Sequence, residues 1–263
     1  MRSMWKGHIR FSLVSIPIQI FNAVESKGNI SFKQLHNEDH GRVKYKKVCA
    51  SCEEEVPYGD IVKGFEYEPD QYVVLQPEEL AALKLKSNKA IDIEAFVDMD
   101  EVPASRYEAV YFVGPNGEVA QKTFSLFCQT LKNSGKAGVG RIILRDREDV
   151  VLMKTHKMGL VMYKLRYPYE LRSIDDVPDL AEVEVDQAQL DLAQTLVSSL
   201  EKPFKEIDFT DRYKDALMEL VEDKISGKEI VTISEEEEAA PVVDIMDALK
   251  ASIEAAKKGK KSA

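Results

Sequence analysis

The chain has 263 residues, of which 44% are hydrophobic, and it carries a formal net charge of −10. This is enough material for one sizeable hydrophobic core with a smaller appended element. No apolar run approaches the roughly 18–20 residues that cross a bilayer, and the N-terminus lacks the pattern of a secretory signal. Three Cys, an odd number, argue against a disulfide framework. We therefore expect a cytoplasmic protein without a membrane segment.

Positive charge is gathered in one part of this acidic chain. Residues 131–169 hold nine Lys or Arg against three Asp or Glu, whereas residues 49–130 sum to −10 and residues 170–240 to −14. Clustered cationic charge is how proteins hold polyanions, while net charge mainly affects solubility. The distribution therefore predicts a polyanion-binding surface within residues 131–169.

The N-terminal half is predicted to be mainly β. Apolar residues alternate from Trp5 to Leu13 and change parity from Val14 onward, which indicates a bulge or a change of strand at that point. The alternation also makes Trp5, Ile9 and Phe11 core residues. Many short strands with few helices favour a barrel or a sandwich. Further strands are expected at 42–48, 72–75, 91–97 and 107–113, and short helices at 77–85 and 123–131.

The basic segment itself reads as a meander of three strands, at 139–145, 150–155 and 160–167. On the third strand Lys164 and Arg166 share one face, which predicts a ribbon with a cationic side. Glycines at positions 135, 138 and 140 favour a tight bend or a close approach of the backbone. The acids of the turn 146–149 would either shield the ribbon tip from phosphate or pair with neighbouring Arg and Lys.

Beyond Pro178 the composition becomes helical. Apolar stripes run through 190–200 and 209–225, and Gly227 is placed as a C-cap. The acidic stretch 234–241 is expected to be a linker. The segment after it, 242–252, can form a short amphipathic helix whose apolar face would carry Val243, Met246, Leu249 and Ile253.

Cys49 and Cys52 have zinc-knuckle spacing, but a strong zinc signal requires a second ligand pair. His36 and His40 lie upstream, and Cys128 is remote in sequence. A reduced, structural pair of thiols is therefore favoured over a metal site, with a redox-sensitive dithiol as a further alternative. No metal or cofactor is expected.

Three stretches of the N-terminal half carry a specific resemblance: WKGHIRFSLVSIPIQIFNA, FKQLHNEDHGRVKYKKVCASC and VPYGDIVKGFEYEPDQYVVL. They resemble the bacterial Ku family, and the similarity continues through the basic meander and the helix around 209–227. The resemblance implies a nucleoid-associated protein of DNA double-strand break repair by prokaryotic non-homologous end joining. Such a protein would bind double-stranded DNA ends as a ring-shaped homodimer and recruit and stimulate a multifunctional ATP-dependent DNA ligase.

The fold implied by the resemblance is mainly β with α. A Ku-like β-barrel core would occupy residues 1–185 and include the basic meander, about 131–169, as a DNA-encircling bridge. A helical, dimer-associated arm would follow at 186–230. A flexible linker and ligase-interacting tail would occupy 231–263, with Val243, Met246, Leu249 and Ile253 contacting the ligase.

The cations of the meander are the predicted DNA-binding residues, acting through phosphates and therefore without sequence preference. They are Lys136, Arg141, Arg145, Arg147, Lys154, Lys157, Lys164 and Arg166. A sliding clamp would show an internal repeat, and an OB-like single-strand binder would interleave aromatic residues with the cations; neither pattern is found. No Walker loop, nucleophile elbow or HExxH motif occurs, so we do not expect an enzyme.

Overall fold

The computed structural model describes residues 1–25, 28–82, 89–144 and 147–227. The chain divides into two compact units, Met1–Asp176 and Val177–Ala263. Within the described ranges, no helix has both the length and the apolar character needed to cross a membrane.

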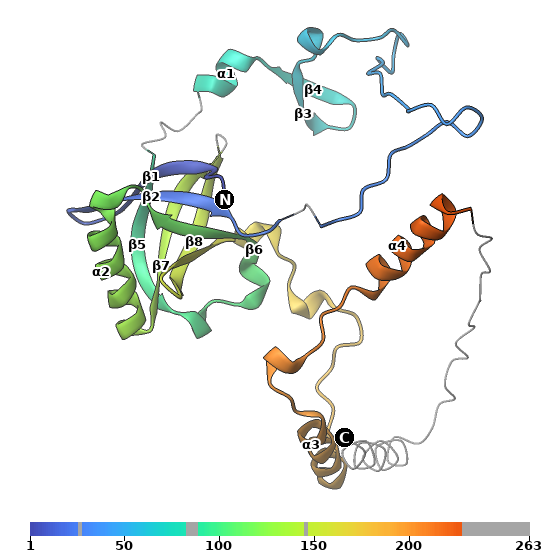
Figure 1. Ribbon diagram of the computed structural model, residues 1–263. Helices are drawn as coiled ribbons and strands as arrows, with labels where there is room; N and C mark the ends of the chain where they lie inside the picture. Colours follow the sequence, from blue (N-terminus) through green and yellow to red (C-terminus); the bar gives the residue numbers. More distant parts are fainter. Residues whose placement is uncertain (26–27, 83–88, 145–146, 228–263) are drawn as a thin grey trace. The chain divides into compact units, whose positions relative to one another are not determined.

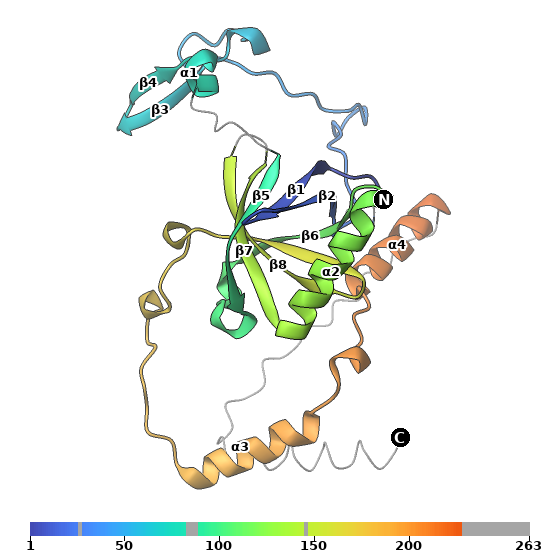
Figure 2. The ribbon, with the colours of Figure 1, turned by 90° about the vertical axis from the view of Figure 1, so that its left-hand side faces the viewer.

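Seven strands of the first unit form a closed barrel in the order β1-β2-β6-β9-β8-β7-β5 (Figures 1 and 2). Neighbouring strands are antiparallel except β1 and β5, which pair in parallel. Of the barrel and the sandwich that the strand-rich sequence favoured, the structure has the barrel, which the family resemblance also implied. Its strands are β1 (Trp5–Phe11), β2 (Val14–Asn22), β5 (Ala90–Asp98), β6 (Tyr107–Pro115), β7 (Lys136–Leu144), β8 (Arg147–His156) and β9 (Gly159–Leu165).

The remaining elements are a separate hairpin and the helices. β3 (Lys63–Glu68) and β4 (Gln71–Leu75) form a two-stranded sheet of their own. The α-helices are α1 (Pro77–Ala82), α2 (Glu118–Ser134), α3 (Gln187–Leu200) and α4 (Arg212–Ile225). Short 3₁₀ helices lie in the connections, at Tyr58–Asp60, Met99–Glu101, Ala104–Arg106, Pro168–Glu170, Ile174–Asp176 and Phe204–Glu206.

The change of parity near residue 13 is a change of strand. β1 and β2 form a hairpin in which Phe11 pairs with Val14 across a two-residue turn. Ser12 takes a left-handed conformation there, with φ of 51°. The switch lets both strands direct isoleucines into the barrel, so Ile9 of β1 and Ile16, Ile18 and Ile20 of β2 are fully buried.

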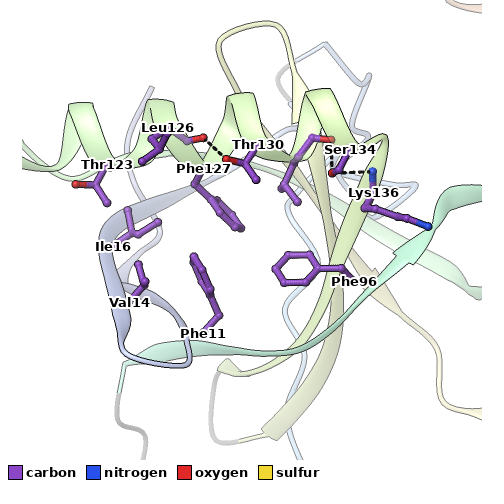
Figure 3. A pocket seen from close by; sticks show the side chains of 11 residues that line it. Phe11, Val14, Ile16, Phe96, Thr123, Leu126, Phe127, Thr130, Ser134 and Lys136 are labelled. Atoms are coloured by element: carbon purple, nitrogen blue, oxygen red, sulfur yellow. Dashed lines mark hydrogen bonds between the residues drawn. The ribbon is translucent and has the colours of Figure 1, made fainter.

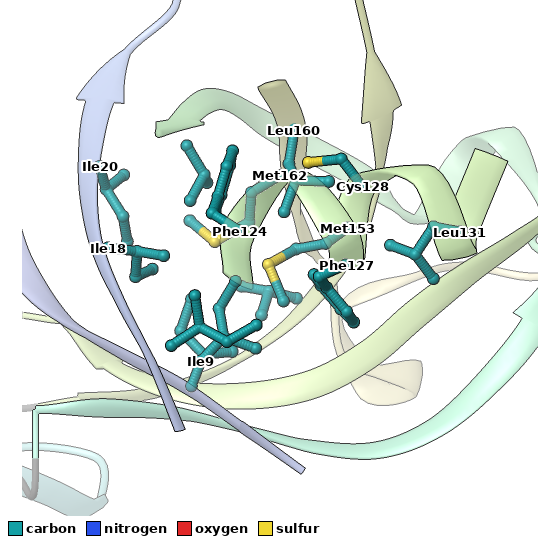
Figure 4. Close-up of a cluster of buried hydrophobic side chains, with 14 of the residues drawn as sticks. Ile9, Ile18, Ile20, Phe124, Phe127, Cys128, Leu131, Met153, Leu160 and Met162 are labelled. Carbon is teal, nitrogen blue, oxygen red and sulfur yellow. The ribbon is translucent and has the colours of Figure 1, made fainter. Parts of the chain in front are cut away.

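The barrel core is completed by one face of α2 (Figure 4). Apolar residues recur along that helix at the spacing of its turns, so Phe124, Phe127, Cys128 and Leu131 pack together against Met153 and Met162 of the barrel strands. Trp5 and Phe11 pack against the same cluster, as the alternation predicted. The predicted helix 123–131 is extended to 118–134 because its apolar stripe continues through the barrel core.

Glycine permits two features at the start of the basic meander. Gly135 ends α2 in the left-handed conformation with φ of 68°. Gly140 lies against the backbone of Asp92 in β5, where a Cβ atom would collide with the Asp92 carbonyl. Both a tight bend and a close approach are therefore present, as the sequence indicated.

One predicted strand is absent from the described residues. The stretch 42–48 contributes only isolated bridges, Leu35 with Arg42 and Val48 with Glu55, rather than a strand. Every described side chain from Ala23 to Ala82 is at least partly exposed. The alternating apolar residues of 42–48 therefore have no hydrophobic core to pack against. The predicted helix 77–85 is described as far as Ala82.

In the second unit, α3 and α4 have carboxylate N-caps and no buried residue. Asp186 accepts from the backbone N–H of Ala188 and Gln189, and Asp211 accepts from that of Lys214. The C-cap of α4 is Ser226, one residue before the predicted Gly227, which follows the cap in the left-handed conformation with φ of 73°.

Candidate nucleic-acid interface

The basic meander forms part of the barrel wall as β7, β8 and β9, joined by antiparallel pairing throughout. Both faces of this wall are packed. Val151, Met153 and Met162 lie in the main core, whereas Leu152 and Leu165 belong to a second cluster with Val139 and Tyr163. The meander therefore does not present one uniformly cationic face; its charges lie at strand ends, in a turn and between packed apolar side chains.

Two of the predicted DNA-binding residues at β7 are held by carboxylates of neighbouring strands. Lys136 Nζ lies 2.6 Å from Asp98 Oδ2. Arg141 Nε lies 2.7 Å from Glu94 Oε1 of β5, and its Nη1 lies 2.9 Å from Glu148 Oε2 of β8. Hydrogen bonds to Glu148 and then Glu94 raise the pKa of Arg141, and the bond to Asp98 raises the pKa of Lys136. Much of the positive charge here is neutralised within the protein.

Lys164 is paired with a buried carboxylate on the inward face of the barrel. Its Nζ lies 3.2 Å from Asp149 Oδ1 and 3.2 Å from Glu108 Oε1. Only 5% of the Asp149 side chain and 19% of the Lys164 side chain are exposed. Burial alone would lower the pKa of Lys164, but the carboxylates of Glu108 and Asp149 outweigh it and raise the pKa. This pair belongs to the architecture of the barrel.

Arg147, at the start of β8, is also engaged. Its Nη2 lies 2.9 Å from Glu170 Oε1, its Nε lies 3.8 Å from Asp149 Oδ1, and its guanidinium lies 5.7 Å from the centre of the Tyr167 ring. Arg147 and Asp149 border a recess of about 290 Å³, which is lined by Met4, Tyr111, Leu144, Arg147, Asp149 and Lys164.

The described acidic side chains of the segment 146–149 form ion pairs with cations of the protein. Glu148 pairs with Arg141, and Asp149 pairs with Lys164 and Arg147. Of the two roles considered for these acids, the pairing role is therefore confirmed for Glu148 and Asp149. Asp146 lies outside the described residues.

Three of the eight predicted cations have no carboxylate partner among the residues that the structure describes. Lys154 lies on β8 and is partly exposed, Lys157 is exposed in the β8–β9 turn, and Arg166 is exposed just after β9. Arg145 lies outside the described residues. Lys154, Lys157 and Arg166 thus retain the charge that a phosphate contact requires.

A further set of cations lies in the excursion, the segment 23–89 that leaves the barrel after β2 and re-enters it at β5. Lys33, Arg42 and Lys44 are exposed and have no carboxylate partner in the described part of the chain. A recess of about 330 Å³ is lined by Phe32, Lys33, Gln34, Arg42, Val43 and Tyr45. The sequence could have indicated this second set of cations, because residues 1–48 hold nine Lys or Arg against three Asp or Glu.

An apolar recess in the barrel unit is of a different kind. It has a volume of about 520 Å³ and lies between α2, the β1–β2 hairpin and Phe96 of β5 (Figure 3). Phe11 stacks on Phe127 with ring centres 5.1 Å apart, and Lys136 contributes the one charged side chain of the lining. Such a surface does not suit a phosphate backbone.

Comparison with known proteins decides the family. The family model described as the Ku70/Ku80 beta-barrel domain matches residues 10–192, which include the end of β1 and the other six barrel strands in full. The chain belongs to the Ku family. The bacterial Ku resemblance of the sequence motifs is thereby confirmed, as is the Ku-like barrel.

Relatives within the Ku family match this chain almost from end to end. A protein of Archaeoglobus fulgidus is 39% identical over 98% of this chain and 100% of its own length. Proteins of Heliobacterium modesticaldum and Bacillus subtilis are 35% and 37% identical over 97% of this chain, and over 92% and 82% of their own lengths. Each of the three is named "Non-homologous end joining protein Ku".

Proposed function

We propose that this protein binds the ends of double-stranded DNA without sequence preference and without catalysis, in repair by non-homologous end joining. The observation that carries the proposal is the near full-length similarity to relatives named for that process. The exposed cations without carboxylate partners support it, because Lys and Arg contact phosphates irrespective of sequence.

The element that surrounds the duplex is proposed to be the excursion 23–89. The meander closes the barrel wall, whereas the excursion starts and ends at barrel strands and buries none of its described side chains. Lys33, Arg42 and Lys44 give it charge to meet a phosphate backbone. Lys154, Lys157 and Arg166 would add contacts from the barrel.

A homodimer is proposed to complete the ring, through the region of α3 and α4. Exposed apolar side chains run along this region, including Val197 (70%), Phe204 (76%) and Tyr213 (75%). Helices of 14 residues are marginal in water unless an apolar face is packed. Burying these faces across a two-fold axis would stabilise them. A chain that sediments as a monomer at micromolar concentration, with and without DNA, would contradict the dimer.

The recruitment of an ATP-dependent DNA ligase is proposed for the C-terminal segment. Val243, Met246, Leu249 and Ile253, predicted to contact the ligase, lie outside the described residues. Deleting residues 241–263 tests the proposal: DNA binding should persist while stimulation of ligation is lost. Full stimulation by the truncated protein would refute it.

The decisive experiment for the ring compares linear duplex with covalently closed circles of the same sequence. A closed ring has to be threaded onto an end, so linear DNA should bind and a nick-free circle should not. Equal affinity for both would refute the ring while leaving DNA binding intact. A sliding clamp is the alternative, but clamps are built from repeated domains, and the described residues contain one barrel without a repeat of it.

A further inference from the structure

Two turns in the excursion share one backbone conformation. In the first turn, His36–Gly41, the His36 N–H donates to the Gly41 carbonyl at 2.8 Å, and the His40 N–H donates to the His36 carbonyl at 2.9 Å. His40 is left-handed, with φ of 55°. The flanking residues continue as a short antiparallel ladder, with the Val43 N–H donating to the Gln34 carbonyl at 3.1 Å.

The second turn, Cys49–Glu54, repeats this pattern thirteen residues later. The Cys49 N–H donates to the Glu54 carbonyl and the Glu53 N–H to the Cys49 carbonyl, both at 2.9 Å. Glu53 is left-handed, with φ of 60°, and the Val56 N–H donates to the Lys47 carbonyl at 2.8 Å. Each bond therefore has its counterpart in the first turn.

Zinc-binding side-chain types occupy equivalent places in the two turns. The first and fourth positions are His36 and Asp39 in one turn and Cys49 and Cys52 in the other. Imidazole, carboxylate and thiolate are the groups that bind zinc, and a spacing of three residues is usual within a ligand pair. The second ligand pair that the bare CxxC motif lacks is supplied by the first turn.

Backbone N–H groups and a neighbouring side chain surround the candidate ligands of both pairs. N–H groups of Cys52 and Ser51 donate to the Cys49 sulfur and lower its pKa. The Gly41 N–H donates to Asp39 Oδ1 at 2.8 Å, and His36 Nδ1 lies 2.9 Å from the same oxygen. The N–H of Gly41 and the bond from His36 lower the pKa of Asp39.

In the described residues, the two turns are held by hydrogen bonds and exposed ion pairs and not by a hydrophobic core. None of the excursion's described side chains from Ala23 to Ala82 is buried. Short segments without a hydrophobic core are usually stabilised by disulfides or by a structural metal. The two thiols of the second turn are free and not joined to each other.

We propose that His36, Asp39, Cys49 and Cys52 together bind one Zn²⁺ ion that ties the two turns into a single small zinc-stabilised module. In the described residues no three such side chains are yet gathered in one place. The ion would therefore bring the two hairpins together, as structural zinc commonly does when binding is coupled to folding.

Metal content of the full-length protein gives the first test. Protein prepared without chelators should contain one zinc per chain, measured by mass spectrometry of the metal. Cys49→Ser, Cys52→Ser and His36→Ala should each lower zinc content at least tenfold at a fixed free-zinc concentration. His40→Asn is the matched control, because Asn tolerates the left-handed conformation and the variant should keep its zinc.

Cobalt substitution tests the ligand set directly. Co²⁺ in a tetrahedral site with two thiolates gives visible bands and a sulfur-to-metal charge-transfer band. Asp39→Cys should raise the charge-transfer absorbance by about half, because three thiolates then replace two. If Asp39 only orients His36, this variant should lose cobalt or leave the charge-transfer band unchanged.

Several results would overturn the proposal. A zinc content near zero with a Cys49–Cys52 disulfide would mean a redox dithiol. Zinc retained in the His36→Ala variant at one ion per two chains would mean that two copies share a site of four thiolates. Loss of zinc from the His40→Asn variant would mean that His40, and not Asp39, is the fourth zinc ligand. All these measurements are made without DNA, so their failure leaves the proposed DNA binding untouched.

Discussion

Replacing Lys164 by Met tests whether this cation stabilises the barrel or contacts DNA, and we expect it to stabilise the barrel. Removal of the ammonium leaves the Asp149 carboxylate, which is 5% exposed, with Arg147 at 3.8 Å as its cationic partner among the described residues. Breaking a buried pair by removing one partner costs about 3–5 kcal/mol, and exposed pairs contribute about 0–1 kcal/mol. Because Lys164 is partly exposed and Arg147 remains, we expect a loss of about 2–4 kcal/mol in the free energy of unfolding.

Urea denaturation of the Lys164→Met variant would measure this loss, and Arg141→Met is the matched control. Both carboxylate partners of Arg141 are more exposed, Glu94 at 52% and Glu148 at 33%, so its loss should be about 0–1 kcal/mol. The double variant Lys164→Met with Asp149→Asn should recover part of the stability, since the buried charge of Asp149 is removed together with its partner.

The salt dependence of DNA binding distinguishes a cation that contacts DNA from one that stabilises the barrel. Lys154→Ala should reduce the slope of log affinity against log salt by about one unit on unrelated sequences, because it removes one phosphate contact. Lys164→Met should leave that slope unchanged. A Lys164→Met protein with undiminished stability and a slope reduced by one unit would refute the structural role assigned to Lys164.

Three further results are expected. Burial raises the pKa of the Cys128 thiol to about 11, so iodoacetamide at pH 8 should not label Cys128 until the protein unfolds; labelling of the native protein would contradict its burial. The hydrogen bond from Arg147 lowers the pKa of Glu170, so the pair adds stability above the ordinary pKa of 4.5 that is lost as pH falls through the lowered pKa. Glu170→Gln should flatten stability against pH in that acidic window, seen in thermal melts. Gly140→Ala should destabilise the barrel by several kcal/mol, because its Cβ would collide with the Asp92 carbonyl; an unchanged melting temperature would refute that close approach.

The local pattern of the sequence was enough to predict several secondary-structure elements and the family of this protein. Alternation in residues 5–20 predicted strand structure with a bulge or a change of strand near residue 13, since a strand can bury only one parity of side chains. A short helix was predicted at 123–131, within α2, and the glycines at the head of the meander indicated a tight bend or a close approach of the backbone. The motifs of the N-terminal half were specific enough to indicate the Ku family, which the comparisons confirmed.

Only the tertiary structure decided which charges are available and which turns correspond. Sequence placed Arg141 and Lys164 in a cationic ribbon, but barrel closure brings Glu94 of β5 and Glu108 of β6 against them. Those acids lie more than thirty residues away in sequence, so no local pattern reveals the pairing. Likewise, His36 and Asp39 match Cys49 and Cys52 only once backbone hydrogen bonds are seen, because composition does not encode a shared turn conformation. The sequence shows which side chains are charged and which could bind a metal. Which charges are neutralised, and which ligands match each other, depends on contacts between segments that only the fold brings together.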